Sequence, residues 1–382
     1  MKATCILLAI SLFFLGSCQN QDEEQNYANN YTLELVDSVQ IDLMSANLIL
    51  HDVHDESGNL LMFQTSPPIV FVLSPNGKIL KKFEMPLEGP SSVGSNLMSV
   101  EFFNEGYALM GQREVKVYDQ EFNVQGSHRI KINSNGSIYR GHNHLMEAEI
   151  DGRKYLTTYF SSQTEFSPVQ LEFYQNLTIL DLLDAESGEY KTLGKLEEGS
   201  HLLNDRAHYF IKPVFHTVND KVYYTMNNDT SLFIMGLPEG NNISRKRIPF
   251  DKFVLSEGYS LGMSGIEEQN KPEPIPGRIH SVFHFEPFDF IEYSSGMSLQ
   301  ELNDAQGANQ EETFANRRRV NPRKYLIMKD GNLVSDYLRI SEKINQLSVA
   351  DNQGNIWATQ NISILDEEPV LITFYKLRIQ PN

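Results

Sequence analysis

Short apolar runs, separated by small and polar residues, follow one another along most of the chain. The runs are rich in Val, Ile, Tyr, Phe and Leu, and Gly, Asn, Asp and Pro interrupt them. No helical period of apolar positions extends through the body of the sequence. This pattern is typical of strands joined by tight turns, and it predicts an all-β fold.

Turn sequences recur along the chain in two series. One series consists of SPNGK (74–78), DAESGE (184–189), LPEGNN (237–242) and KDGN (329–332). The other consists of DESGN (55–59), FNEGY (103–107), EIDGRKY (149–155), TVNDKVYY (217–224), FEPFDF (285–290) and DNQGNIW (351–357). Asn-Gly and Asp-Gly readily adopt the positive φ angles of tight hairpins. The second series recurs at intervals that average about 59 residues, which fits a repeat of four strands.

These turns divide the body of the chain into six units. The first five span residues 48–84, 97–132, 144–196, 208–249 and 279–340, and the sixth begins at Ile344. The sixth unit has room for only three strands before Asn382, whereas one further strand-like run, residues 31–43, precedes the first unit. If that run supplies the missing outer strand, the ends of the array join. The sequence therefore predicts a six-bladed β-propeller closed by its N-terminal strand.

The long connections between strands are expected on one face of this propeller. They are residues 161–175 within the third unit, 251–278 before the fifth unit and 295–323 within the fifth unit. Each joins the second strand to the third, or the fourth strand to the first of the next unit. Those two kinds of connection share one face of a propeller, and we expect the functional site on this long-loop face.

The first 17 residues have the pattern of a secretory signal peptide, with Lys2 before an apolar run that is too short to span a bilayer. LGSC at residues 15–18 resembles the lipobox of bacterial lipoproteins, which implies acyl chains on Cys18 and a membrane anchor. Residues 18–30 are polar and acidic and are expected to form a tether to a propeller over residues 31–382. The acidic residues 22–24 are similar to surface-export signals of Bacteroidetes-type lipoproteins. We expect a cell-envelope location at the outer membrane, on either its periplasmic or its surface-exposed side.

The composition narrows the classes of partner and of chemistry. The net charge of −18, from 32 basic and 50 acidic residues, argues against nucleic acid and requires any anion site to be a local basic patch. Loss of Cys5 with the signal peptide leaves Cys18 as the remaining cysteine, so no disulfide is expected. No nucleophile elbow, phosphate loop or full set of metal ligands is apparent, and neither a metal nor another cofactor is predicted.

The lipobox, the hairpin series and LEGPSSVGS at residues 87–95 resemble a Bacteroidetes lipoprotein family, domain of unknown function 4221. More broadly, the pattern is similar to the NHL-like and TolB-like six-bladed propellers. The resemblance implies a propeller fold and an envelope location. It implies no established activity.

An Arg-x-His pattern occurs three times, as Arg140 and His142, Arg206 and His208, and Arg278 and His280. Each pair falls at the start of the innermost strand of its unit or in the loop before it, in three consecutive units. We expect the pairs to meet at one arc of the channel mouth, where they would bind a carboxylate, sulfate or phosphate. The alternative is structural, with each arginine tying neighbouring blades through a carboxylate such as Asp205 or Glu147.

Two functions are compatible with this architecture. The favoured one is a lipid-anchored envelope propeller that binds a ligand or protein partner through its long-loop face. An anionic small molecule, an acidic glycan or an envelope protein would be the partner. The alternative is a propeller-type hydrolase or lyase acting on an acidic glycan or similar substrate, with the arginines as a clamp and one His as general base. Propellers host many activities, and the absence of a catalytic motif favours binding over catalysis.

Overall fold

The computed structural model describes residues 30–42, 48–129, 145–159, 166–208, 211–262, 268, 273–365, 367 and 369–382. The expected signal peptide, Cys18 and all of the tether except Asn30 lie outside these residues. Among the helices that the structure describes, none is long and apolar enough to cross a membrane.

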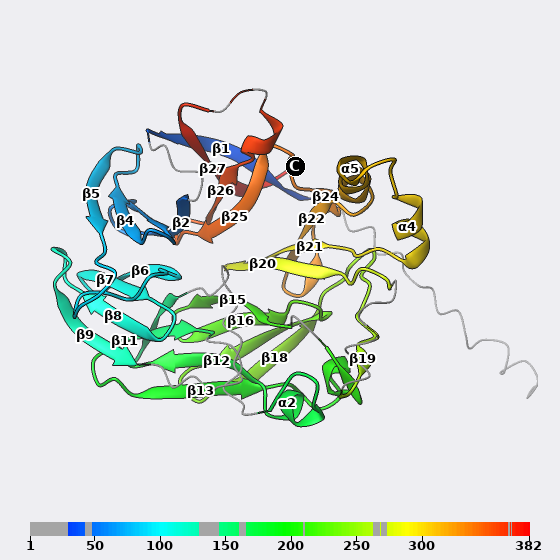
Figure 1. Ribbon diagram of the computed structural model, residues 1–382, viewed down its shortest axis with the longest axis horizontal. Helices are drawn as coiled ribbons and strands as arrows, with labels where there is room; N and C mark the ends of the chain where they lie inside the picture. The colour runs from blue at the N-terminus through cyan, green and yellow to red at the C-terminus, as the bar shows by residue number, and fades with distance from the viewer. Residues whose placement is uncertain are drawn as a thin grey trace, which may run out of the picture.

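Six antiparallel sheets surround a central axis as the blades of a propeller (Figure 1). Blade one contains β2 (Leu48–Val53), β3 (Leu60–Gln64), β4 (Ile69–Leu73) and β5 (Ile79–Glu84); blade two contains β6 (Ser99–Phe103), β7 (Gly106–Met110), β8 (Glu114–Tyr118) and β9 (Val124–Arg129); blade three contains β10 (Met146–Ile150), β11 (Arg153–Thr158), β12 (Thr178–Leu183) and β13 (Tyr190–Lys195). Blade four contains β15 (Pro213–Val218), β16 (Lys221–Met226), β17 (Ser231–Gly236) and β18 (Asn241–Arg247); blade five contains β20 (Arg278–Phe285), β21 (Phe288–Ser294), β22 (Arg323–Lys329), β23 (Asn332–Leu333) and β24 (Leu338–Arg339). The predicted all-β, six-bladed fold is confirmed.

The sixth blade joins the two ends of the described chain. Its order is β1 (Tyr31–Ile41), β27 (Ile372–Pro381), β26 (Asn355–Gln360) and β25 (Ile344–Ala350). Strand β1 is antiparallel to β27 from the pair Tyr31 and Pro381 to the pair Ile41 and Ile372. The N-terminal strand therefore closes the ring as the outer strand of the last blade, as the strand count of the sequence predicts.

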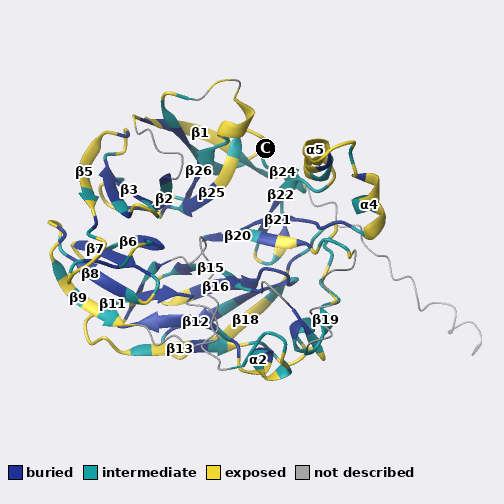
Figure 2. Cartoon of the chain, in the orientation of Figure 1, coloured by how far each residue is buried: buried dark blue, intermediate teal, exposed yellow. Residues whose placement is uncertain are grey.

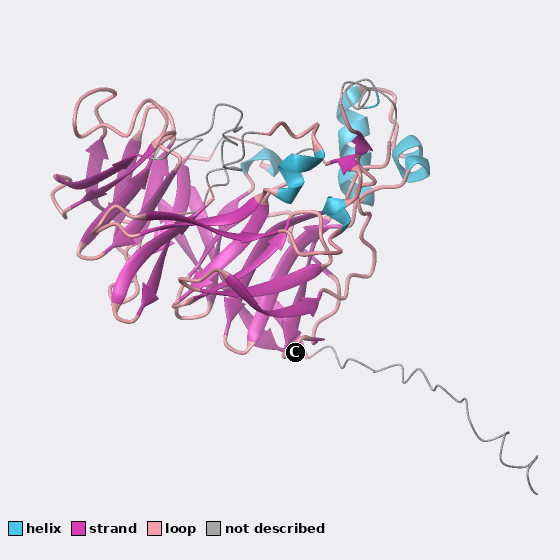
Figure 3. Cartoon of the chain, turned by 90° about the horizontal axis from the view of Figure 1, so that it is seen from below, coloured by secondary structure: helices cyan, strands magenta, loops and turns pink. Residues whose placement is uncertain are grey.

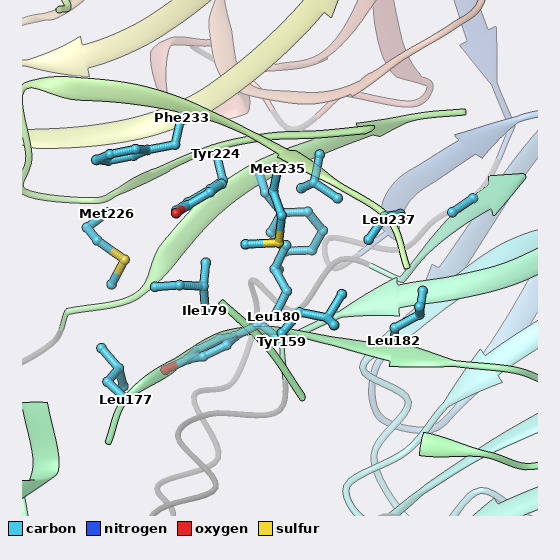
Figure 4. Packing of buried hydrophobic residues seen from close by; sticks show 14 of the residues in the cluster. Tyr159, Leu177, Ile179, Leu180, Leu182, Tyr224, Met226, Phe233, Met235 and Leu237 are labelled. Carbon is cyan, nitrogen blue, oxygen red and sulfur yellow. The ribbon is translucent and has the colours of Figure 1, made fainter. Parts of the chain in front are cut away.

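The core is divided among the junctions between blades. Each of the six buried apolar clusters combines side chains from two neighbouring blades, and together the clusters run around the ring (Figure 2). Figure 4 shows the junction of blades three and four, where Ile179, Leu180 and Leu182 face Tyr224 and Met235. Because every sheet is apolar on both faces, each blade needs a neighbour on either side.

The turns between the first and second strands of the blades have the predicted hairpin chemistry. Asn104 and Asn219 adopt φ angles of 53° and 54°, in the left-handed region that asparagine tolerates better than most residues. Gly106, just beyond the Asn104 turn, has no room for a side chain, since an added Cβ would lie 2.0 Å from the carbonyl oxygen of Tyr118. These short turns fix the register of the inner hairpin of each blade.

Carboxylates on the inner strands also link the first three blades. The Phe102 amide donates to Oδ2 of Asp52 at 2.7 Å, and the Glu147 amide donates to Oε1 of Glu101 at 2.8 Å. Burial raises the pKa of Asp52 to about 7 and raises that of Glu101 well above its usual range. On this side of the channel, the two buried carboxylates are therefore occupied in holding one blade to the next.

The long connections gather at one end of the strands, as predicted, while the C-terminus lies at the other end (Figure 3). They contain the helices α2 (Leu171–Gln175), α4 (Leu299–Asp304) and α5 (Gln310–Val320) and the short strand β19 (Tyr259–Ser260). The connection between β13 and β15 contains the 3₁₀ turn η1 (His201–Leu203) and the short strand β14 (Arg206–Ala207). The predicted start of the fourth unit, residue 208, requires correction. Residues 206 and 207 pair with β19 outside the blade, and the inner strand of blade four begins at Pro213.

Candidate functional site

A cavity of about 230 Å³ lies at the long-loop end of the central channel. Its walls come from the inner strands β15, β20 and β25, with smaller contributions from β10, β21 and β22. Strands β20 and β25 approach one another less closely than the other neighbouring inner strands do, which leaves room for the cavity between them. The ionisable side chains in its lining are Lys212, Arg278, His280, Glu292 and Arg323.

Two of these cations have no acidic partner in the part of the chain that the structure describes. Neither the Lys212 ammonium nor the Arg278 guanidinium forms an ion pair or a hydrogen bond with the residues that the structure describes. Burial, reinforced by the neighbouring charge of Arg278, lowers the pKa of Lys212 to about 7. Burial also lowers the pKa of Arg278, which nevertheless stays charged because a guanidinium is a very weak acid. The two groups form an electropositive site that no described residue neutralises.

Arg323 differs from these two cations because it forms an ion pair with Glu292. Its guanidinium binds the carboxylate of Glu292 and also donates to the carbonyl oxygen of Asn345. The Ser281 hydroxyl donates to the second carboxylate oxygen of Glu292 at 2.9 Å. Burial raises the pKa of Glu292, whose side chain is 0% exposed, while Arg323 and Ser281 act in the opposite direction. Arg323 and Glu292 thus balance each other, and Lys212 and Arg278 supply the excess positive charge.

The third predicted Arg-x-His pair contributes to this cavity. Arg278 is the first residue of β20, and both Arg278 and His280 belong to the cavity lining. Nε2 of His280 lies 2.8 Å from the Ser294 hydroxyl oxygen, on the adjacent strand of the same blade. These two residues lie where the sequence predicts, at the channel mouth on the long-loop face.

The second pair lies elsewhere in the fold. Arg206 donates from Nε and Nη2 to the carbonyl oxygen of Gly258, at 3.1 and 2.8 Å, and its Nη2 lies 3.5 Å from the Glu268 carboxylate. These contacts tie β14 to the connection that precedes blade five. Arg206 is absent from the described cavity lining, and its carboxylate partner is Glu268, where the sequence suggested Asp205 or Glu147.

His208 is a buried structural residue in this arrangement. Its side chain is packed against Tyr174 and His201, and its Nε2 lies 2.9 Å from Oδ1 of Asn204. Burial lowers the pKa of His208 to about 4, and the charges of His201 and Arg206 act in the same direction. The ring is therefore neutral at pH 7, and the geometry around the second pair favours the structural alternative.

Arg140 and His142, the first pair, lie outside the described residues. Their role in ligand binding stays a prediction. Within the described residues, no group of three or more His, Cys, Asp or Glu side chains is arranged to hold a metal ion. Glu147, which the sequence offered as a carboxylate partner for an arginine, forms an ion pair with Lys154 at 2.8 Å.

Sequence patterns did not identify Lys212, Arg323 or Glu292 as site residues. Lys212 immediately precedes Pro213 at the start of an inner strand, a position equivalent to that of Arg278 in the next blade. A comparison of strand starts between blades could have found it. Arg323 belongs to the basic run 316–324, whose first residues lie in the largely exposed helix α5. Arg323 is the first residue of β22 and lines the cavity.

The depressed pKa of Lys212 predicts a pH-dependent contribution to stability. The folded pKa is about 7, while an unfolded lysine titrates near about 10.4. Between these values the unfolded chain binds a proton that the folded chain does not, so stability rises with pH in this window. Below pH 7 Lys212 is charged in both the folded and the unfolded chain, so the folded chain bears the full desolvation cost of the ammonium.

We therefore expect the free energy of unfolding of Lys212→Met at pH 6 to exceed that of the wild type by about 2 kcal/mol or more. This difference should disappear by pH 10. Urea unfolding curves between pH 6 and 10 test this expectation. Lys195→Met, which removes an exposed lysine, is the control for the loss of a positive charge. A difference between Lys212→Met and the wild type that does not change with pH would contradict the assignment.

Comparisons with known proteins support the fold. No family model and no curated protein matches the sequence. Among solved structures, the chain is similar to a member of the domain of unknown function 4221 family from Bacteroides vulgatus, with a TM-score of 0.62 and 11% identity, covering 93% of this chain and 99% of that one. It is also similar to a candidate exported protein from Bacteroides fragilis, with a TM-score of 0.53 and 12% identity, covering 92% and 95% of the two chains. The resemblance expected from the sequence is confirmed as a likeness of fold.

Proposed function

We propose that this protein is a lipid-anchored cell-envelope propeller that binds a small anionic ligand in the cavity at its long-loop face. The ligand carries a carboxylate, sulfate or phosphate group. Arg278 donates two parallel hydrogen bonds to that group. Lys212, whose pKa is about 7 in the empty site, supplies a second positive charge when the bound anion favours its protonated form. The role of the propeller is to hold these side chains, which come from different blades, on a rigid ring of strands.

The observation that carries the proposal is the pair of cations for which the described residues supply no acidic partner. The chain has a net charge of −18, yet Lys212 and Arg278 line one cavity and neither is neutralised by a described residue. Two like charges held together in a partly buried site raise the free energy of the empty protein. An anion placed between them removes this cost and is the natural complement of the site.

The positions of the chain ends support the proposed anchoring. Strand β1 begins at Tyr31, beside Pro381, at the end of the blades that also carries the C-terminus (Figure 3). A tether from Cys18 would join the propeller at this end, so the cavity at the opposite end would face away from the membrane. The similar Bacteroides fragilis protein is a candidate for export, which agrees with an envelope location.

The proposal is tested by thermal unfolding of a chain that begins at residue 19, in the presence of sulfate, phosphate, glucuronate and the uncharged sugar glucose. The anions should raise the unfolding temperature in a saturable manner, whereas glucose should not. Ligand at one hundred times its Kd adds about 2.7 kcal/mol of stability. Arg278→Gln should weaken anion binding about 10- to 100-fold, because it removes a charge-assisted hydrogen-bonding group.

Arg206→Gln is the matched control for this experiment. It removes an arginine from the same Arg-x-His pattern but at a position outside the described cavity lining, and its anion affinity should equal that of the wild type. Equal anion affinities for the wild type and Arg278→Gln would refute the proposed site. Loss of binding in Arg206→Gln alone would move the site to β14.

A further inference from the structure

The backbone of Lys212 is fixed at the rim of the cavity. Its amide donates to Oδ1 of Asn227 at 3.1 Å, and its carbonyl oxygen accepts from the Asn227 amide at 2.8 Å. Asn227 is itself buried and follows β16 in the same blade. Pro213 comes next in the chain and restricts the backbone further. Lys212, which belongs to the cavity lining, therefore has a fixed backbone.

The surroundings of this amine favour its neutral form. The charged and titratable groups of the cavity lining are Arg278 and His280 on β20, Glu292 on β21 and Arg323 on β22. The lining residues of β25 are uncharged, and β10 contributes Met146. Glu292 is occupied by Arg323 and Ser281, so no acid in the lining is left to stabilise the Lys212 ammonium. A lysine with a neutral amine at physiological pH is a nucleophile.

We propose that Lys212 forms a reversible imine with a small carboxylate ligand that also carries an aldehyde or ketone group. This inference rests on the proposed anion site and names the class of ligand, 2-oxo acids and related carbonyl acids. Arg278 binds the carboxylate and Lys212 attacks the carbonyl carbon. The cavity of about 230 Å³ accommodates a molecule of this size.

The chemistry requires only the ligand and water. The nitrogen lone pair of Lys212 forms a bond to the carbonyl carbon, while the C=O π electrons move to oxygen, which receives one amine proton and becomes a hydroxyl group. The carbon–oxygen bond of this carbinolamine then breaks, the hydroxyl group takes the second amine proton and leaves as water, and a C=N bond forms. One amine and one carbonyl group give one imine and one water molecule, with no oxidation or reduction. The step is reversible, so the imine retains the ligand and does not consume it.

The positions of the two cations suit this reaction. In a 2-oxo acid the carbonyl carbon is bonded directly to the carboxylate carbon, so a group that binds the carboxylate presents the carbonyl to a neighbouring amine. Arg278 and Lys212 line the same cavity, so a carboxylate bound by Arg278 lies in the cavity that also contains the amine. Burial, the main cause of the lowered pKa of Lys212, persists when the ligand is bound.

The test is reductive trapping of the chain that begins at residue 19, at pH 7.5, with pyruvate and sodium cyanoborohydride, followed by mass spectrometry and peptide mapping. Lactate, which has the carboxylate but no carbonyl group, is the matched ligand. We expect a single stable pyruvate adduct on Lys212, formed on the order of tenfold faster or more than on any other lysine, because more of its amine is neutral. Lys212→Arg should lose the adduct, and the control Lys195→Arg should keep it.

Thermal unfolding with pyruvate and with lactate separates the two proposals. A saturable shift with both acids, together with an adduct on Lys212 from pyruvate alone, supports both the anion site and the imine. A shift with both acids but no adduct, or adducts spread over exposed lysines at similar rates, overturns the imine and leaves the anion site. No shift and no adduct removes both. An adduct on Lys212 that forms equally fast in Arg278→Gln would show that Arg278 does not position the carboxylate.

Discussion

A chain that begins at residue 43, without β1, is expected to lose the cooperative unfolding transition of the intact protein. Strand β1 pairs with β27 along its length, and Val39 and Ile41 are buried in the cluster that joins blades six and one. Each of these side chains contributes about 1.5–3 kcal/mol by burial. The strand also covers the edge of β27, whose exposed backbone groups would otherwise invite aggregation. The combined loss approaches the whole stability of an ordinary domain, about 5–15 kcal/mol.

Circular dichroism, calorimetry and size-exclusion chromatography of the truncated chain measure this loss. A synthetic peptide of residues 30–42 should restore the transition when added in excess, since the ring closes through noncovalent pairing. The same peptide with aspartate at positions 39 and 41 is the control and should fail, because it would bury charge against Leu50 and Phe374. Cooperative melting of the truncated chain at the wild-type temperature would show that closure by β1 is dispensable.

Arg323→Ala is expected to destabilise the protein by about 3–5 kcal/mol, because it leaves the Glu292 carboxylate buried without its ion-pair partner. The cost should depend on pH. Burial already raises the pKa of Glu292, and removal of Arg323 raises it further. A carboxyl group with a raised folded pKa destabilises the fold increasingly as pH rises from its unfolded pKa, about 4.3, to its folded pKa. The variant should therefore be least impaired near pH 4 and most impaired above neutrality.

Chemical unfolding of Arg323→Ala between pH 4 and 8 tests this prediction. The double variant Arg323→Ala/Glu292→Gln should recover part of the loss at pH 7 and should lack the pH dependence, because the uncompensated carboxylate is gone. Arg339→Ala, at an exposed position on β24 of the same blade, controls for the removal of an arginine from this sheet. A loss of less than 1 kcal/mol in Arg323→Ala at pH 7 would mean that solvent, and not Arg323, stabilises Glu292.

The sequence predicts the repeat and its closure because both depend on local patterns. Hairpin residues such as Asn104 and Asn219 mark the turns, and alternating apolar runs mark the strands. The missing strand of the last blade and the extra strand before the first are apparent from counting alone. The face that carries the long connections follows from the order of strands within a blade, and the helices α2, α4 and α5 lie on that face.

The site is only partly predictable, because it is assembled from separate blades. Arg278 was found through a recurring tripeptide. Lys212 belongs to no such motif and lines the same cavity as Arg278 because the ring places their two blades side by side. The same tripeptide at Arg206 has a different role, since β14 pairs with β19 and withdraws it from the inner strand. A motif fixes the spacing of side chains along the chain but not the strand to which they belong. The burial that lowers the pKa of Lys212 is a property of the folded ring.

Crystals of the protein soaked in sodium bromide offer the most direct test of the central claim, that Lys212 and Arg278 form an anion site in the channel. Anomalous diffraction at the bromine absorption edge locates bound bromide independently of any chemical assumption. We predict a strong peak in the cavity, within contact distance of Nζ of Lys212 and the guanidinium of Arg278, and no such peak in crystals of Arg278→Gln. Bromide bound elsewhere on the protein, with none in this cavity, would contradict the claim.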